Sequence, residues 1–170
     1  MKKRVCLILT AVLLAACLCA CGTNKAGFTK EDLSLTVAGC KITPDTSVEA
    51  ILSALGGDYT YAEAISCVYT GMDKTYTYAG ATLYTYPDGE DDRLMELYCE
   101  QDVQTSKGIT IGAGRDDVIA QYGSSYVETG SILSYELPAS ASENLPASLY
   151  FLITDGKVAA IAITAEHRAE

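Results

Sequence analysis

The chain has 170 residues, of which 12 are basic and 22 acidic, so its formal net charge is −10 at pH 7. A surface this acidic repels phosphate groups, which argues against nucleic acid or anionic lipid as a partner and favours cationic partners or divalent ions. Twelve tyrosines stand against two phenylalanines and no tryptophan. Runs rich in tyrosine and threonine are typical of β-strands.

The first residues have the pattern of an export signal. The basic residues 2–4 precede an almost wholly apolar run over 5–21, which at 17 residues is shorter than a spanning helix of about 20. A basic start followed by such a run predicts a secretory signal. It ends in two overlapping boxes of Leu, two small residues and Cys, one at Cys17 and one at Cys21.

This N-terminus resembles a bacterial lipoprotein signal, in which a cysteine becomes the first residue and carries the lipid. Cys17 has the cleaner box, whereas Cys21 is followed by the more typical glycine and polar residues. We therefore expect residues 1–20 to be the signal peptide and Cys21 to be lipidated, with Cys17 as the alternative. Residues 21–31 would be the lipidated cysteine and a polar tether, and several acyl chains would anchor the protein stably on the extracytoplasmic face of the cell membrane.

Removal of residues 1–20 takes away three basic and no acidic residues, so the mature chain has 9 basic and 22 acidic residues and a net charge of −13. Three cysteines then remain for pairing: Cys40, Cys67 and Cys99. Outside the cytoplasm two of the three are candidates for one disulfide, with all three pairings open, and buried free thiols are the alternative. None of them forms a C-x-x-C motif, which argues against a redox motif or a zinc ribbon.

The chain contains an internal repeat. Residues 42–59 align with 109–126 at an offset of 67 without a gap, so that Gly56 meets Gly123. The match resumes downstream, where 81–84 lies over 147–150 at offset 66 and 88–89 lies over 155–156 at offset 67. Agreement in this order and spacing predicts two tandem repeats, residues 32–103 and 104–166, with a tail at 167–170.

Both repeats predict the same elements. A strand over 33–42 or 105–111 leads into a short helix, whose apolar face in the first repeat is Val48, Ile51, Leu52 and Leu55. Thr46 and Glu49 have the spacing of a capping box, and Gly56 and Gly123 fall where a helix ends. The strands that follow are expected at about 64–70, 75–78, 81–86 and 94–100, then 131–137, 147–153 and 157–164, with a loop over 138–146.

These elements predict an α+β fold. A helix of about two turns is not stable alone, so it must pack on a sheet. We expect two tandem strand–helix–β-meander repeats that form one antiparallel sheet, with the short helices on one face and the other face partly open.

A duplicated plan of this kind behind a lipid-anchored N-terminus resembles the β-lactamase-inhibitor-protein-like and SmpA/OmlA-like lipoprotein modules. Several short segments also resemble a family of uncharacterised Gram-positive lipoproteins; they are 66–67, 71–74, 76–78, 85–87 and 107–112. The resemblance covers about residues 30–165. It implies protein-binding or envelope roles and brings no catalytic residue.

The stretch from Gly108 to Gly123 begins like a nucleotide-binding loop. Gly112 and Gly114 supply the first two glycines of G-x-G-x-x-G, but the third position is Asp117. Acidic residues in the first helical turn complement the helix dipole and repel a pyrophosphate. The stretch therefore predicts a strand-to-helix turn, and no cofactor is expected.

Four tyrosines are the candidates for partner binding: Tyr76, Tyr78, Tyr84 and Tyr86. Each pair alternates with other residues along a strand, which places its two members on one sheet face. If exposed, they would form a rigid platform for a protein partner; the alternative is that they cover the core beneath the helices.

Two further features offer little chemistry. The acidic run 88–92 has clustered oxygens but lacks the spacing of a calcium loop, so a solvated hairpin turn is predicted and no metal site. His167 is the only histidine and lies in the tail, where it is badly placed to act as a base. We therefore expect a non-catalytic, lipid-anchored protein-binding module, an adaptor or inhibitor-like. The alternative is a structural envelope lipoprotein that stabilises a larger membrane-associated assembly.

Overall fold

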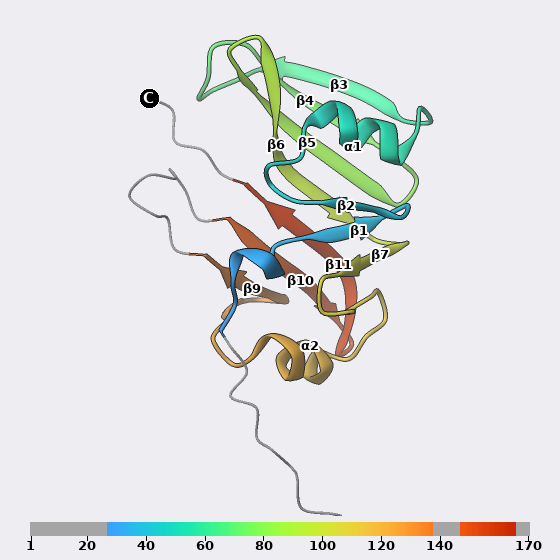
Figure 1. Ribbon diagram of the computed structural model, residues 1–170, viewed down its shortest axis with the longest axis vertical. Helices are drawn as coiled ribbons and strands as arrows, with labels where there is room; N and C mark the ends of the chain where they lie inside the picture. The colour runs from blue at the N-terminus through green and yellow to red at the C-terminus, as the bar shows by residue number, and fades with distance from the viewer. Residues whose placement is uncertain (1–26, 138–146, 166–170) are drawn as a thin grey trace, which may run out of the picture.

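The computed structural model describes residues 27–137 and 147–165. It is an α+β fold in which antiparallel strands dominate and two short helices accompany them (Figure 1). The elements in chain order are η1 (Lys30–Asp32), β1 (Leu35–Val37), β2 (Cys40–Ile42), α1 (Val48–Leu55), β3 (Thr60–Ile65), β4 (Met72–Thr77), β5 (Ala81–Asp88), β6 (Asp91–Cys99), β7 (Val103–Thr105), α2 (Arg115–Tyr122), β8 (Val127–Thr129), β9 (Ile132–Glu136), β10 (Ser148–Thr154) and β11 (Lys157–Thr164). The α+β class that the sequence predicts is confirmed.

Eight strands form one large sheet in the order β3-β4-β5-β6-β11-β10-β9-β8. It consists of two sequential meanders, β3 to β6 and β8 to β11, whose last strands pair with each other. That central pairing is antiparallel and sets Cys99 opposite Ile161 and Glu96 opposite Thr164. The first strand of each meander is therefore an outer edge of the sheet.

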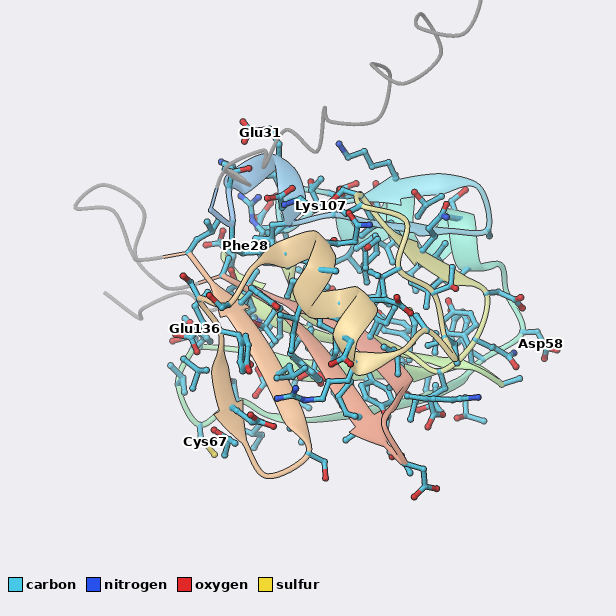
Figure 2. The ribbon with its side chains drawn as sticks, turned by 90° about the horizontal axis from the view of Figure 1, so that it is seen from below. Phe28, Glu31, Asp58, Cys67, Lys107 and Glu136 are labelled. Atoms are coloured by element: carbon cyan, nitrogen blue, oxygen red, sulfur yellow. The ribbon has the colours of Figure 1, made fainter. Side chains whose placement is uncertain are left out.

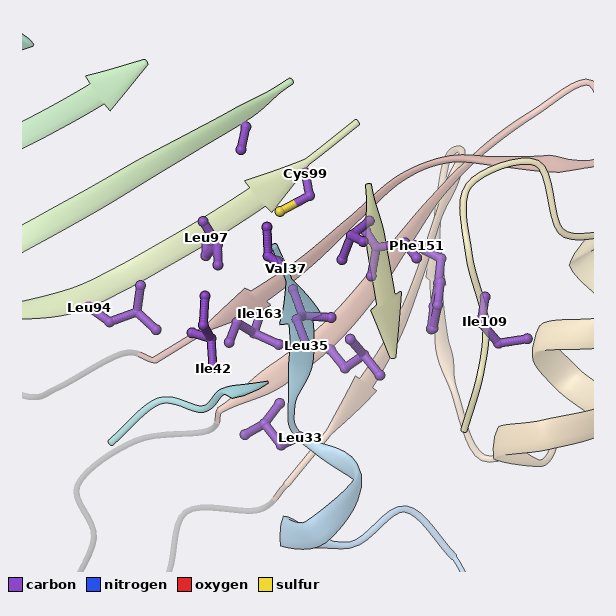
Figure 3. Packing of buried hydrophobic residues seen from close by; sticks show 14 of the residues in the cluster. Leu33, Leu35, Val37, Ile42, Leu94, Leu97, Cys99, Ile109, Phe151 and Ile163 are labelled. Carbon is purple, nitrogen blue, oxygen red and sulfur yellow. The ribbon is translucent and has the colours of Figure 1, made fainter. Parts of the chain in front are cut away.

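The helices and a small sheet cover one face of the large sheet. Figure 1 shows α1, the three-stranded sheet β2-β1-β7 and α2 in front of the long strands. Figure 3 shows side chains of the small sheet, such as Leu35 and Val37, facing Leu97 and Ile163 of the large sheet. These residues belong to a single core cluster, which also includes residues of both helices. Each helix is too short to be stable alone and is stabilised by this apolar contact with the sheets.

The two helices have matching ends. Each has eight residues, they begin 67 positions apart, and each is followed by a glycine of positive φ, 89° at Gly56 and 91° at Gly123. With ψ near 180° this is a conformation that glycine reaches almost alone, and the sequence prediction of glycine helix ends is confirmed. The predicted capping box of Thr46 and Glu49 is wrong. Ser47 is the N-cap and accepts a hydrogen bond from the Ala50 amide at 3.3 Å.

The predicted strand over 33–42 is a hairpin, because Ala38 and Gly39 have positive φ and turn the chain between β1 and β2. The strand expected at 64–70 begins and ends earlier, as β3. Ser66 then stops it, since its hydroxyl accepts hydrogen bonds from the amides of Val68 and Tyr69 at 3.3 and 3.1 Å.

In the second half, the strand expected over 105–111 is the shorter β7, followed by a turn that returns to pair Thr110 with Gln104. Strand β8 was not predicted. The Asp155-Gly156 turn between β10 and β11 is as predicted, with φ of 51° and 74°.

Several predicted features lie outside the described residues: Cys17 and Cys21 with the signal and most of the tether, the 138–146 loop, and the tail with His167. In the described ranges, neither helix has the length and apolar character that a membrane-crossing helix needs.

Candidate functional site: the tyrosine clusters of the large sheet

In the glycine-rich turn before α2, the backbone amides of residues 112–115 all donate hydrogen bonds within the protein. The amide of Gly112 donates to the Val158 carbonyl at 2.8 Å and that of Arg115 to the Gly156 carbonyl at 3.0 Å. The carboxylate of Asp117 accepts from the Gly114 amide at 3.0 Å. The amides that would cradle a phosphate are therefore already used, and the stretch is the strand-to-helix turn that was predicted.

The acidic run 88–92 forms the turn between β5 and β6, and its ends are paired with basic side chains. Asp88 accepts from Arg93 Nε at 2.9 Å, and Asp92 from Lys74 Nζ at 2.7 Å. The hydrogen bond to Asp92 raises the pKa of Lys74. Among the described residues, no three His, Cys, Asp or Glu side chains gather in a way that would hold a metal ion.

The three candidate cysteines lie in different parts of the fold and are free thiols in the structure. Cys40 on β2 and Cys67 after β3 are exposed, and Figure 2 shows Cys67 at the border of the molecule. Cys99 is buried in the core (Figure 3), which raises the pKa of its thiol to about 12 and keeps it protonated and unreactive. The pairing of two of them stays a prediction.

The four candidate tyrosines do not form one surface. Tyr76 and Tyr78 lie on the helix-covered face, where Tyr76 is buried and the Tyr78 hydroxyl donates to the Gly56 carbonyl at 3.2 Å. Tyr84 and Tyr86 lie on the opposite, uncovered face. Tyr84 is 37% exposed, whereas Tyr86 is 3% exposed because the ring of Tyr69 stacks on it, with 4.8 Å between centroids.

Tyr84 belongs to a cluster on the uncovered face, which we call the Tyr84 cluster: Tyr84, Glu96, Tyr98 and Tyr150. Strand register sets Tyr84 opposite Glu96 and places Ala162 between Tyr98 and Tyr150. Ala162 has no exposed surface although it points away from the core, since the flanking rings cover it. The cluster thus spans the line where the two meanders meet.

Two members of the Tyr84 cluster are joined by a hydrogen bond. The Tyr150 hydroxyl donates to Oε1 of Glu96 at 2.6 Å. Burial, with this hydrogen bond, raises the pKa of Tyr150, and burial also raises the pKa of Tyr98. Both phenols therefore stay protonated at neutral pH, and Tyr150 donates its hydrogen bond to a half-buried carboxylate. Aromatic faces around a carboxylate suit a basic side chain, above all arginine.

A second set of rings, the edge cluster, lies at the border formed by β3: Tyr59, Tyr61, Tyr76 and Tyr78. Tyr59 contacts Tyr76 and Tyr78 with centroids 5.2 and 5.4 Å apart, and Tyr61 contacts Tyr76 at 5.2 Å. The Tyr61 hydroxyl donates to Glu63 in the same strand, which raises the pKa of Tyr61 to about 12. Tyr59 and Tyr61 remain more than a third exposed.

The sequence prediction found one or two members of each cluster and missed the rest. Tyr98 lies on β6 and Tyr150 on β10, in different halves of the chain. They become neighbours on either side of Ala162 only because β6 pairs with β11. Tyr59 and Tyr61 lie before the strand start that was predicted. The repeated tyrosines at 84 and 150, 66 positions apart, were a signal for their shared face.

Comparison of the chain with protein-family models, with curated proteins and with solved structures found no match.

Proposed function

We propose that this protein is a lipid-anchored, extracytoplasmic, non-catalytic module that binds a protein partner through the uncovered face of its large sheet. The observation that carries the proposal is the Tyr84 cluster. Three phenol rings surround a carboxylate on a face that the helices leave open. Rigid aromatic residues around a central polar group are typical of the energetic centre of a protein interface.

The charge of the chain favours a basic partner surface. The mature chain would carry 9 basic and 22 acidic residues, and Glu96 lies opposite Tyr84 in the strand register with one carboxylate oxygen bonded to Tyr150. A partner arginine placed there would gain both an ion pair and a cation–π contact. Long-range attraction would also speed the encounter and make it sensitive to salt.

The anchor is part of the same proposal. The basic start, the apolar run and the Leu-Cys-Ala-Cys box favour lipid on Cys21, with Cys17 as the alternative. Mass spectrometry of the membrane-extracted protein tests this. Lipid on Cys21 is expected; lipid on Cys17, or an unmodified Cys21, would contradict the choice.

We also propose that the two meanders descend from one duplicated unit, as in the lipoprotein modules that the sequence resembles. Support comes from helices that start 67 positions apart, from their matching glycine ends, and from a strand order that reads as two meanders meeting at β6 and β11. On this view the Tyr84 cluster is a surface that the duplication created, because each half supplies part of it.

The binding proposal is tested with the full tagged chain, cross-linked in cells and purified from membranes. One partner in fixed stoichiometry is expected, and Tyr84→Ala and Glu96→Lys should each weaken its binding by more than ~1 kcal/mol, roughly fivefold in Kd. Tyr61→Ala, another exposed tyrosine of the same sheet, is the matched control and should leave this binding unchanged. Equal loss with Tyr61→Ala would reject the Tyr84 cluster as the site, and a complex of many subunits would favour the structural envelope role.

A further inference from the structure

Strand β3 is an open edge of the large sheet. It is first in the strand order, so within the described chain only β4 pairs with it, and it does so over six residues without a register shift. All six residues are exposed, Tyr61 at 48% and Ile65 at 80%. Natural edge strands are usually protected by charged side chains, above all lysine, by proline, by a bulge or by shortness; of these devices β3 has only the single charge of Glu63.

The other edge of the sheet is protected. Strand β8 has three residues, and its central Glu128 is held by Arg115, with 3.0 Å between Nη2 and Oε2. Arg115 also donates to the Tyr126 hydroxyl at 3.2 Å. The contrast indicates that the exposure of β3 is a specific feature of one edge, and that pairing there would close as a dimer instead of extending into a fibre.

We propose that β3 is a self-association site, at which it pairs antiparallel with β3 of a second copy about a two-fold axis through Ala62. This inference is independent of the partner proposed for the Tyr84 cluster, which lies on another part of the sheet.

The side chains favour the register that is centred on Ala62. In an antiparallel pair, facing residues lie on the same side of the sheet, so a symmetric pair must centre on a residue. Centring on Glu63 would set two carboxylates opposite each other, which is destabilising. Centring on Ala62 sets Tyr61 opposite Glu63 of the second copy.

With this register the exposed residues meet complementary ones. The Tyr61 hydroxyl, which donates to Glu63 of its own strand, would have Glu63 of the second copy directly across. Ile65, the most exposed large apolar residue of the described chain, would lie against Tyr59 of the second copy. On the uncovered face only the small residues Thr60, Ala62 and Ala64 meet, so no bulky side chain hinders the approach.

Charge sets how strong this pairing is. Glu63 is the only charged residue of β3, but two acidic chains repel each other as whole molecules. Salt screens that repulsion, so self-association should strengthen as salt rises. Binding of a basic partner at the Tyr84 cluster should weaken under the same change, which separates the two contacts.

The test uses two copies of the full chain with different tags, co-expressed and extracted from membranes in mild detergent, with capture on one tag and detection of the other. Wild-type copies should capture each other. Ala62→Lys with itself, and Ala62→Glu with itself, place like charges across the axis and should lower capture about tenfold. Capture of Ala62→Lys by Ala62→Glu should return to at least the wild-type level, which also shows that both variants fold.

Thr129→Lys is the matched control, because it adds the same charge to an exposed position of the β8 edge, 67 residues further on. It should leave capture unchanged. Failure of wild-type copies to capture each other, undiminished capture of Ala62→Lys by itself, or no recovery in the mixed pair would each overturn the proposal. Tyr84→Ala should not affect self-capture, so failure here is distinct from failure of the partner proposal.

Discussion

The halves of the molecule around α1 and α2 each contain an eight-residue helix and a four-stranded meander, and they differ in the side chains that pack beside the helix. Both helices have eight residues, and both end on a glycine whose carbonyl accepts a hydrogen bond from a tyrosine hydroxyl. Tyr78 bonds Gly56 at 3.2 Å and Tyr135 bonds Gly123 at 2.9 Å. Tyr135 is fully buried, whereas Tyr78 is only partly so. The same contact is thus interior in one half and peripheral in the other.

In the α2 half, aromatic side chains pack around the residue at the end of the helix. The ring of Tyr122 lies 6.1 Å from Phe28, 5.2 Å from Tyr135 and 5.6 Å from Phe151, measured between centroids. Lys107 Nζ lies 4.7 Å from the centre of the same ring, and Figure 2 shows Phe28 and Lys107 beside α2. Phe28, which precedes η1, therefore packs on the core of the second half.

In the α1 half, the residue at the end of the helix is aliphatic. It is Leu55, 67 positions before Tyr122, and it is only partly buried. The aromatic residues of this half instead gather at the β3 border, where Tyr59 and Tyr61 remain exposed. The core of the α1 half is thus packed without the rings of Tyr59 and Tyr61, which leaves these rings exposed for contact with another molecule.

The largest expected effect tests the two helix faces. Tyr122→Ala removes a ring with 1% of its surface exposed and should lower the free energy of unfolding by about 3–5 kcal/mol, the usual cost of deleting a buried aromatic side chain. Leu55→Ala, the matched variant, should cost about 1 kcal/mol because the side chain is partly solvated. Urea unfolding followed by circular dichroism measures both. Equal losses would show that the α1 half depends on its helix as strongly as the α2 half does.

A smaller effect tests the shared backbone. At both Gly56 and Gly123 a methyl group would meet no atom within 4 Å, so alanine there is resisted by the positive φ alone. Gly56→Ala and Gly123→Ala should each cost about 1–3 kcal/mol, and the two losses should agree. Gly57→Ala, at the next position and without positive φ, is the control and should be nearly neutral. If one of the two is neutral, the helix ends are not equivalent in solution.

Local signals carried most of the predicted fold. The helix at 48–55 follows from an apolar face at helical spacing and a terminal glycine, and the β10–β11 hairpin from Asp155-Gly156. Boundaries failed where short-range polar contacts decided them. Ser47 was available as a cap one position after Thr46, and Ser66 ends β3 through hydrogen bonds that no periodicity reveals.

The sites were harder to predict because they depend on long-range pairing. Alternation correctly grouped Tyr76 with Tyr78 and Tyr84 with Tyr86, but it does not say which face the helices cover. The burial of Tyr86 depends on Tyr69, whose ring stacks on it from the loop after β3. The exposure of β3 is a property of its position in the sheet order, which local sequence patterns do not encode.

The smallest effect concerns the tyrosines that bond the helix ends. Burial raises the pKa of Tyr135 from 10.0 to about 12, so the folded state favours its protonated form. This contribution to stability is fully present below pH 10 and is lost as the pH rises towards 12. Tyr135→Phe loses the bond to the Gly123 carbonyl, worth about 1 kcal/mol, and it has no phenol to ionise. The difference between wild type and variant should therefore be largest at neutral pH and shrink between pH 10 and 12, as measured by urea unfolding at each pH. Tyr78→Phe is the matched variant. Burial raises the pKa of Tyr78 too, but its hydroxyl bond is longer and exposed, so this variant should lose less free energy of unfolding at every pH. A loss for Tyr78→Phe as large as that for Tyr135→Phe would mean that the two halves bury their helix ends equally.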